Sequence, residues 1–182
     1  MPMLKNLVVY ASETGNTQKL AEEIYSVLPS SMGEKDIVNV RAWNGKLDAE
    51  NYFVGFWANR GSCSLEIIDL LSSLHNRNIA LFGTCGMGSS EKYYTSLEQN
   101  ACVWISDSNN FLGSFFCQGK MQEAIRAKYE SYRGQKDDSK IDLILSYFDQ
   151  ALTHPDRTDL LKAHMFVENC VKKIQTLTPT PV

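Results

Sequence analysis

The chain has 182 residues, about the length of one domain, and its 43% apolar content is enough for a sizeable core. A formal net charge of -3 without a basic stripe argues against nucleic-acid binding. No apolar run approaches the length that spans a bilayer, and no signal-peptide hydrophobic region precedes the first strand, so we expect a cytoplasmic protein without membrane insertion.

The N-terminal segment predicts a strand, a tight loop and a helix in direct succession. An apolar run over residues 7–11 ends abruptly, and helical spacing of apolar residues begins at Leu20. The loop between them consists of Ser12, Glu13, Thr14, Gly15, Asn16 and Thr17. Backbone N–H groups at the start of such a helix, together with hydroxyls, form a site for an anion. The alternative is a Ser/Thr-rich helix cap that binds nothing.

The composition of this loop narrows the anion that it could bind. It contains no Gly-Lys-Ser/Thr, so it offers no lysine for a nucleotide β- or γ-phosphate. It also contains no Gly-x-Gly-x-x-Gly, which argues against a dinucleotide. A monophosphate held by amides and hydroxyls, without a balancing cation, fits best.

The next two strands are expected at residues 36–42 and 52–57. The second of these is almost wholly apolar, as a central parallel strand should be, and it ends at Trp57. The residues of the loop that follows are Ala58, Asn59, Arg60, Gly61 and Ser62. An amphipathic helix over about residues 65–74 comes next.

The fourth and fifth strands are expected at residues 78–83 and 111–118. A third loop after the fourth strand consists of Thr84, Cys85, Gly86, Met87 and Gly88. Helices are expected over about 89–106 and 121–133, then a charged linker over 134–140, and further helices over 141–152 and from about Pro155. Residues 176–182, with two Thr-Pro pairs, indicate a flexible tail.

Strands that alternate with helices predict an α/β fold with a doubly wound, five-stranded parallel sheet in the order 2-1-3-4-5. Ligands bind such sheets outside the carboxyl ends of the strands, where the three loops converge. We expect a single domain over residues 1–175, with a core at about 4–133 and extra C-terminal helices at about 141–175.

The loops resemble those of a known family. The pattern Ser12-x-Thr14-Gly15-x-Thr17 after the first strand is similar to the phosphate loop of flavodoxins, which bind flavin mononucleotide (FMN). The stretch from Trp57 to Gly61 looks like the flavodoxin loop whose aromatic residue stacks on the flavin, and Thr84 to Gly88 resembles the loop that holds its pyrimidine edge. The resemblance covers about residues 4–133 and implies a flavodoxin-like fold with FMN as cofactor. The alternative for Trp57 is that it closes the core above the third strand.

The second loop departs from the flavodoxin pattern in two ways. The resemblance implies a peptide that flips on one-electron reduction, which glycine favours, but Gly61 comes late and Asn59 is the other candidate. Arg60 beside the flavin would raise its reduction potential, unless this arginine is solvated and contacts nothing. In the helix after the third loop, Tyr93 or Tyr94 could cover the outer flavin face while at least one of them packs in the helix interface.

The five cysteines, Cys63, Cys85, Cys102, Cys117 and Cys170, form an odd set without a Cys-x-x-Cys pair. They predict no disulfide framework, iron–sulfur cluster or metal site. We expect Cys85 to be a small residue that touches the flavin and not a nucleophile.

Three functions are compatible with this sequence. The first is an FMN electron carrier that shuttles single electrons between redox partner proteins, a reductase donor and an acceptor enzyme, with no catalytic residue of its own. The second is an FMN-dependent NAD(P)H:quinone-type reductase, in which the extra helices would wall a second-substrate pocket. The third is a non-redox interaction protein that kept the fold and lost FMN.

Overall fold

The computed structural model describes residues 3–42, 48–88 and 90–177. Five parallel strands form its sheet: β1 (Leu4–Tyr10), β2 (Lys35–Asn39), β3 (Ala49–Trp57), β4 (Asn78–Cys85) and β5 (Asn110–Gln118). Their order across the sheet is β2-β1-β3-β4-β5, which confirms the predicted topology. The helices are α1 (Asn16–Val27), α2 (Leu65–Ser73), α3 (Glu91–Cys102), α4 (Glu123–Glu130), α5 (Asp138–Ala151) and α6 (Arg157–Leu177), with a 3-10 turn at Ser30–Met32.

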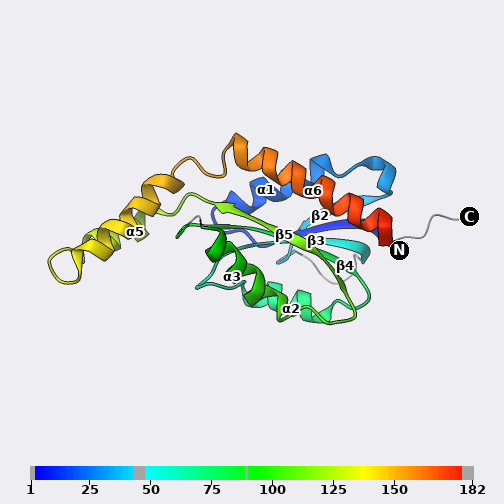
Figure 1. The fold of residues 1–182 in the computed structure, drawn as a ribbon, viewed down its shortest axis with the longest axis horizontal. Helices are drawn as coiled ribbons and strands as arrows, with labels where there is room; N and C mark the ends of the chain where they lie inside the picture. The colour runs from blue at the N-terminus through cyan, green and yellow to red at the C-terminus, as the bar shows by residue number, and fades with distance from the viewer. Residues whose placement is uncertain (1–2, 43–47, 89, 178–182) are drawn as a thin grey trace, which may run out of the picture.

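Helices cover both faces of the sheet, with α1 and α6 on one face and α2 and α3 on the other (Figure 1). Successive strand residues point to opposite faces, so Val8 and Phe53 join one buried cluster while Val9 and Val54 join the other. Both faces are therefore apolar, which explains why the central strands are continuous apolar runs. Among the helices of the described residues, none combines the length and apolar character that a membrane span requires.

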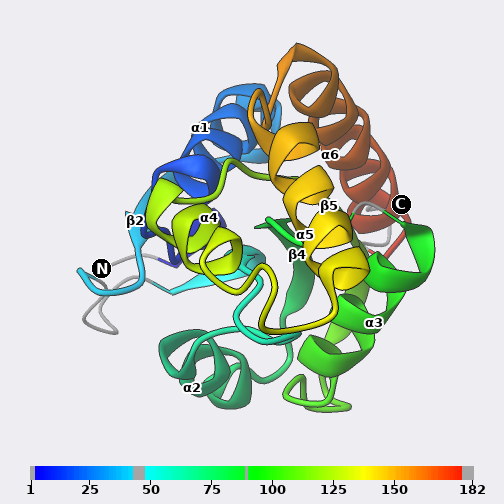
Figure 2. The ribbon, with the colours of Figure 1, turned by 90° about the vertical axis from the view of Figure 1, so that its left-hand side faces the viewer.

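The two helices expected to follow the core have different positions. α6 packs along α1 and contributes Ala163, Val167 and Cys170 to the buried cluster on that face. α5 instead pairs with α4, and this α4–α5 hairpin extends beyond the sheet at the end where the strands terminate (Figures 1 and 2). The hairpin has its own apolar contact surface, including buried Leu145 and Phe148. It is an insertion between β5 and α6.

Several element boundaries differ from the sequence-based expectation. β2 ends at Asn39 and not at residue 42, and β4 continues to Cys85, so Thr84 and Cys85 belong to a strand end instead of a loop. The charged residues 134–140 were expected to be a linker, but α5 already begins at Asp138, capped by the Asp137 carboxylate. The tail expected at 176–182 is helical up to Leu177, and residues 178–182 lie outside the described ones.

Amide side chains connect four strands near their amino ends. Asn51 Nδ2 donates to Asn6 Oδ1 at 3.1 Å, Asn78 Nδ2 to Asn51 Oδ1 at 2.7 Å, and Asn110 Nδ2 to Asn78 Oδ1 at 2.9 Å. The two asparagines of each pair also lie directly opposite each other on neighbouring strands. We call these four residues the amide ladder.

Candidate functional site

The loop between β1 and α1 presents polar groups at the carboxyl end of the sheet. Gly15 is the N-cap of α1 and has φ +87°, a left-handed conformation that glycine adopts without strain. The Gly15 N–H donates to Ser12 Oγ at 3.2 Å, and Asn16 Nδ2 donates to Thr14 Oγ1 at 3.0 Å. The loop is thus held by its own side chains, with Thr14 and Gly15 exposed.

Thr17, expected to add a donor for an anion, is 1% exposed. Its hydroxyl forms a hydrogen bond of 2.9 Å with the Thr84 hydroxyl at the end of β4. In this arrangement Thr17 ties the start of α1 to the sheet and does not face the cleft described below.

The loop after β3 is a tight hairpin turn. Backbone hydrogen bonds link Asn59 and Ser62 in both directions, at 2.8 and 3.0 Å. The central residues Arg60 and Gly61 have φ +51° and +82°, the signature of a type I′ turn. Positive φ therefore falls on Arg60 and Gly61, not on Asn59. From α3, Asn100 Nδ2 donates to the Gly61 carbonyl at 2.8 Å and anchors the turn.

The loop after β4 packs against the segment that follows β5. A Cβ atom on Gly86 would lie 2.2 Å from Met121 Cγ, and one on Gly119 would lie 3.0 Å from Thr84 Cβ. Glycine at these positions lets the segments approach closely. The strand ends of β1, β4 and β5 are thereby brought together.

These loops surround a cleft of about 390 Å³, within the usual range for small-molecule sites. Its lining from the predicted loops is Glu13, Thr14, Asn16, Trp57, Ala58, Arg60, Gly61, Thr84, Cys85, Gly86 and Met87. The predicted residues Ser12, Gly15, Thr17, Asn59 and Gly88 are not in the lining that the described residues form. Tyr93 lines the cleft, whereas Tyr94 packs against the Phe116 ring with 6.3 Å between ring centroids.

One wall of the cleft was not predicted from the sequence. It consists of Gly119, Lys120, Met121, Gln122, Ile125 and Tyr129, from the end of β5 and from α4. The part of this wall after β5 could have been predicted. Gly119 directly follows a strand of the same parallel sheet, so its loop lies at the same edge as the other three loops. The contribution of α4 depends on how the hairpin folds back, which residue spacing does not specify.

The base of the hairpin is tied to the first loop. The Lys120 carbonyl accepts a hydrogen bond of 2.8 Å from Asn16 Nδ2, and the Lys120 N–H donates to the His154 carbonyl at 2.9 Å. Lys19 Nζ donates to the Pro155 carbonyl. The start of α1, the segment before α4 and the segment before α6 therefore meet at one point.

Burial raises the pKa of the Cys85 thiol to about 12, although a hydrogen bond with Tyr94 opposes the shift. The thiol contacts the carbonyl oxygens of Gly88 and Cys117 at 3.4 and 3.6 Å. It is protonated at neutral pH, and a thiol is a poor nucleophile.

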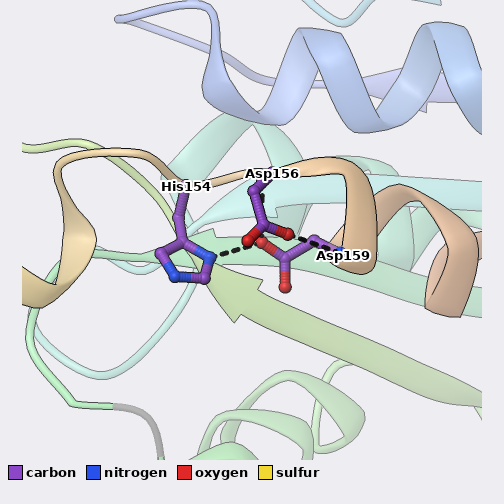
Figure 3. A group of neighbouring side chains, drawn as sticks. All are labelled: His154, Asp156 and Asp159. Atoms are coloured by element: carbon purple, nitrogen blue, oxygen red, sulfur yellow. Dashed lines mark hydrogen bonds and ion pairs between the residues drawn. The ribbon is translucent and has the colours of Figure 1, made fainter.

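His154, Asp156 and Asp159 form a cluster with the spacing of metal ligands (Figure 3). Its hydrogen bonds are those of a helix start: the Asp159 N–H donates to Asp156 Oδ1 at 3.0 Å, and the Asp156 N–H donates to Asp159 Oδ2 at 2.9 Å. This reciprocal arrangement is a capping box. His154 Nδ1 lies 2.5 Å from the same Asp159 oxygen, so the buried carboxylate already has protein partners. The cluster caps α6.

Comparisons with known proteins agree with this architecture. A family model described as a flavodoxin domain matches residues 7–168. The chain is 36% identical over 174 residues to the flavodoxin-like domain-containing protein BilS of Clostridioides difficile, covering 93% of this chain and 98% of the relative. It is 32% identical over 183 residues to the protein of the same name from Clostridium symbiosum, covering 92% and 96%. The crystal structure of oxidised flavodoxin 2 from Bacillus cereus superposes with a TM-score of 0.60 at 16% identity, covering 93% of this chain and 99% of that one, which shows the fold.

Proposed function

Because the chain belongs to the flavodoxin domain family, we propose that it binds FMN in this cleft and carries single electrons between redox partner proteins. The observation that carries the proposal is the convergence of the loops after β1, β3 and β4 on one cleft. Each loop supplies a different kind of group, as one elongated cofactor with a phosphate at one end and a flat ring at the other requires.

The donor set at the first loop fits a phosphate. Thr14 offers a hydroxyl, which the Asn16 side-chain amide holds in place, and the first turn of α1 offers backbone N–H groups without partners inside the helix. Gly15 has no atom within 4 Å of the place where a Cβ would be, so the approach to these N–H groups is open. We assign the phosphate end of FMN to this loop.

The other part of the cleft fits a flat apolar ring. Trp57, Tyr93 and Tyr129 contribute aromatic surface, and Met87, Met121 and Ile125 contribute aliphatic surface. The residues of α4 exclude water from one side of the site, and the glycine-rich loop after β4 presents backbone groups to a polar ring edge. FMN, when bound, supplies the redox chemistry, while the chain binds it, orients it and limits its exposure.

The wall formed by α4 is the observation that favours the second candidate, an NAD(P)H-dependent reductase. Such an enzyme needs a bounded space for a second substrate, and Ile125 and Tyr129 bound the cleft on that side. We expected the extra C-terminal helices at about 141–175 to wall such a pocket, but the residues that could do so lie on α4.

Two measurements on the purified protein test the proposal. In the first, FMN is titrated into the protein, and we expect its fluorescence to be quenched by binding at a single site. In the second, we expect the FMN-loaded protein to oxidise NAD(P)H only when a separate flavodoxin reductase is added. Absence of FMN binding would contradict the proposal, and NAD(P)H oxidation without a reductase would favour the second candidate.

A further inference from the structure

We infer that Lys120 supplies the positive charge that the first loop lacks and makes the site select FMN over riboflavin, which has no phosphate. This inference rests on the proposed function. Lys120 lies far from the first loop in the sequence, and the segment that contains it matches no flavin-binding motif.

Lys120 is placed beside the groups that we assign to the phosphate. It lines the main cleft together with Thr14 and Asn16. The same three residues also line a second hollow of about 250 Å³, whose remaining lining is Met121, Gln122 and Glu123. Lys120 therefore lines both hollows where they meet Thr14 and Asn16.

Two hydrogen bonds made by the Lys120 backbone fix the position of its Cα atom, from which the side chain extends. Its carbonyl accepts from Asn16 Nδ2, the residue that also holds Thr14 Oγ1, and its N–H donates to the His154 carbonyl. A single amide group thus links the first loop to Lys120. Because the backbone is held at both peptide groups, the flexible side chain starts from a fixed point next to the loop.

The charges around this position leave Lys120 available for an anion. Within the described part of the chain its ammonium has no ion-pair partner, whereas Lys19 in α1 is engaged by the Pro155 carbonyl. Of the two carboxylates that line the hollows, Glu13 lies 3.9 Å from Arg41 Nη2. Glu123 lines the second hollow and forms no ion pair with Lys120 among the described residues.

An ammonium adjacent to a phosphate gives a charge-assisted interaction that a neutral ligand cannot form. The isoalloxazine ring and ribityl chain are common to FMN and riboflavin. The contribution of Lys120 should therefore appear as a difference in affinity between these two ligands.

The test compares dissociation constants for FMN and riboflavin, measured by quenching of flavin fluorescence, in four proteins: the unchanged chain, Lys120→Ala, Lys120→Arg and Lys128→Ala. Lys128 is an exposed lysine on α4 outside the cleft lining, so its replacement makes the same change in net charge. We expect Lys120→Ala to weaken FMN binding about tenfold and to leave riboflavin binding unchanged. Lys120→Arg should retain most of the affinity for FMN, and Lys128→Ala should change neither constant.

Salt provides a second measurement. FMN affinity of the unchanged protein should fall as sodium chloride is raised, and it should fall less in Lys120→Ala because one screened interaction is missing. The inference is overturned if Lys120→Ala leaves FMN affinity unchanged or weakens FMN and riboflavin equally, since the latter shows a packing effect. If the unchanged chain binds FMN but Lys120→Ala has no effect, only this inference fails; if the unchanged chain does not bind FMN, the proposed function fails as well.

Discussion

Arg60 illustrates how single residues set the properties of the cleft. It occupies the first central position of the type I′ turn with φ +51°, a conformation that few residues with a side chain adopt. The mutual hydrogen bonds of Asn59 and Ser62 hold it there, and its side chain lines the cleft. Under the proposed function, a guanidinium at this position would stabilise negative charge on the reduced FMN.

We expect Arg60→Glu to lower the reduction potential of bound FMN. Replacing a positive charge by a negative one near the ring disfavours the more anionic reduced form, by about 1 kcal/mol per unit charge at an exposed position. Spectroelectrochemical titration measures the potential. Lys92→Glu makes the same charge change on α3 outside the cleft lining and serves as the control. An equal or higher potential in Arg60→Glu would contradict this prediction.

The sequence predicted the roles of residues that act within their own loop. It did not predict roles that depend on a partner far away along the chain. Thr14 and Trp57 line the cleft as their motifs indicated. Thr17 belongs to the same motif, yet its hydroxyl bonds Thr84, a residue 67 positions away. The position of Lys120 was not predictable, because its neighbours in the cleft, Thr14 and Asn16, lie about a hundred residues earlier in the chain.

At the scale of elements, α4 changes the character of the site. The loops after β1, β3 and β4 line most of the cleft. Ile125 and Tyr129 of α4 line a further side of it, and α5 supports α4 through an ion pair of 2.6 Å between Arg126 and Asp149. In the proposed binding mode, the hairpin would contact the ring of FMN, while Lys120 at its base would face the phosphate.

We expect Tyr129→Ala to weaken the binding of FMN and riboflavin to the same extent, by roughly three- to tenfold, because an aromatic contact contributes about 0.5–1.5 kcal/mol. Isothermal titration calorimetry with both flavins measures the change. Leu143→Ala, on the exposed side of α5, removes a side chain of similar apolar character outside the cleft lining and should have no effect. A loss confined to FMN would show that Tyr129 acts on the phosphate instead.

The capping box of α6 predicts a dependence of stability on pH. The Asp159 N–H donates to the Asp156 carboxylate and, against some desolvation, lowers the pKa of Asp156 below its ordinary value of about 3.9. A carboxylate with a lowered pKa stabilises the folded state above its unfolded pKa, and this contribution is lost as the pH falls through the folded value.

The melting temperature of Asp156→Asn should therefore differ most from that of the unchanged protein above about pH 4, and the difference should shrink at lower pH. Thermal unfolding followed by circular dichroism across this range measures it. Asp107→Asn, at an exposed position, should show a small difference with little pH dependence. A gap for Asp156→Asn that stays constant down to pH 2 would exclude this linkage.

At the scale of the whole molecule, strand order and the position of the cleft were predictable because alternating strands and helices admit few topologies. What the sequence left open was the assignment of the last helices. Apolar spacing indicated that the last helix, α6, buries one face, but spacing does not say which part of the protein covers that face, and it placed no buried face on α5. In the structure, Val167 of α6 is buried in the apolar cluster between α1, α6 and the sheet. Leu145 of α5 is buried in the α4–α5 hairpin.

The amide ladder links four of the five strands, and its fully buried inner member, Asn51, should matter most. Asn51→Ala would remove the donor to Oδ1 of buried Asn6 and the acceptor for Nδ2 of half-buried Asn78. Leaving buried polar groups unpaired should lower the free energy of unfolding by about 2–4 kcal/mol, measured by urea denaturation. Asn110→Ala, at the exposed end of the ladder, should cost less than about 1 kcal/mol. Equal losses would show that the amides do not act as a connected set.

The ladder lies at the end of the sheet opposite the cleft, yet it bears on the dimensions of the cleft. A strand that slipped by two residues would keep its apolar side chains on the same faces, so hydrophobic burial alone does not forbid the slip. Such a slip would move Trp57 roughly 7 Å along the sheet relative to its register partner Thr84. The asparagines meet at one offset only, and at that offset Trp57 is the register partner of Thr84, whose hydroxyl bonds Thr17 at the start of α1. The ladder therefore favours the strand register on which the position of Trp57 in the cleft depends. Under the proposed function, we expect a substitution in the ladder to change FMN affinity as well as stability.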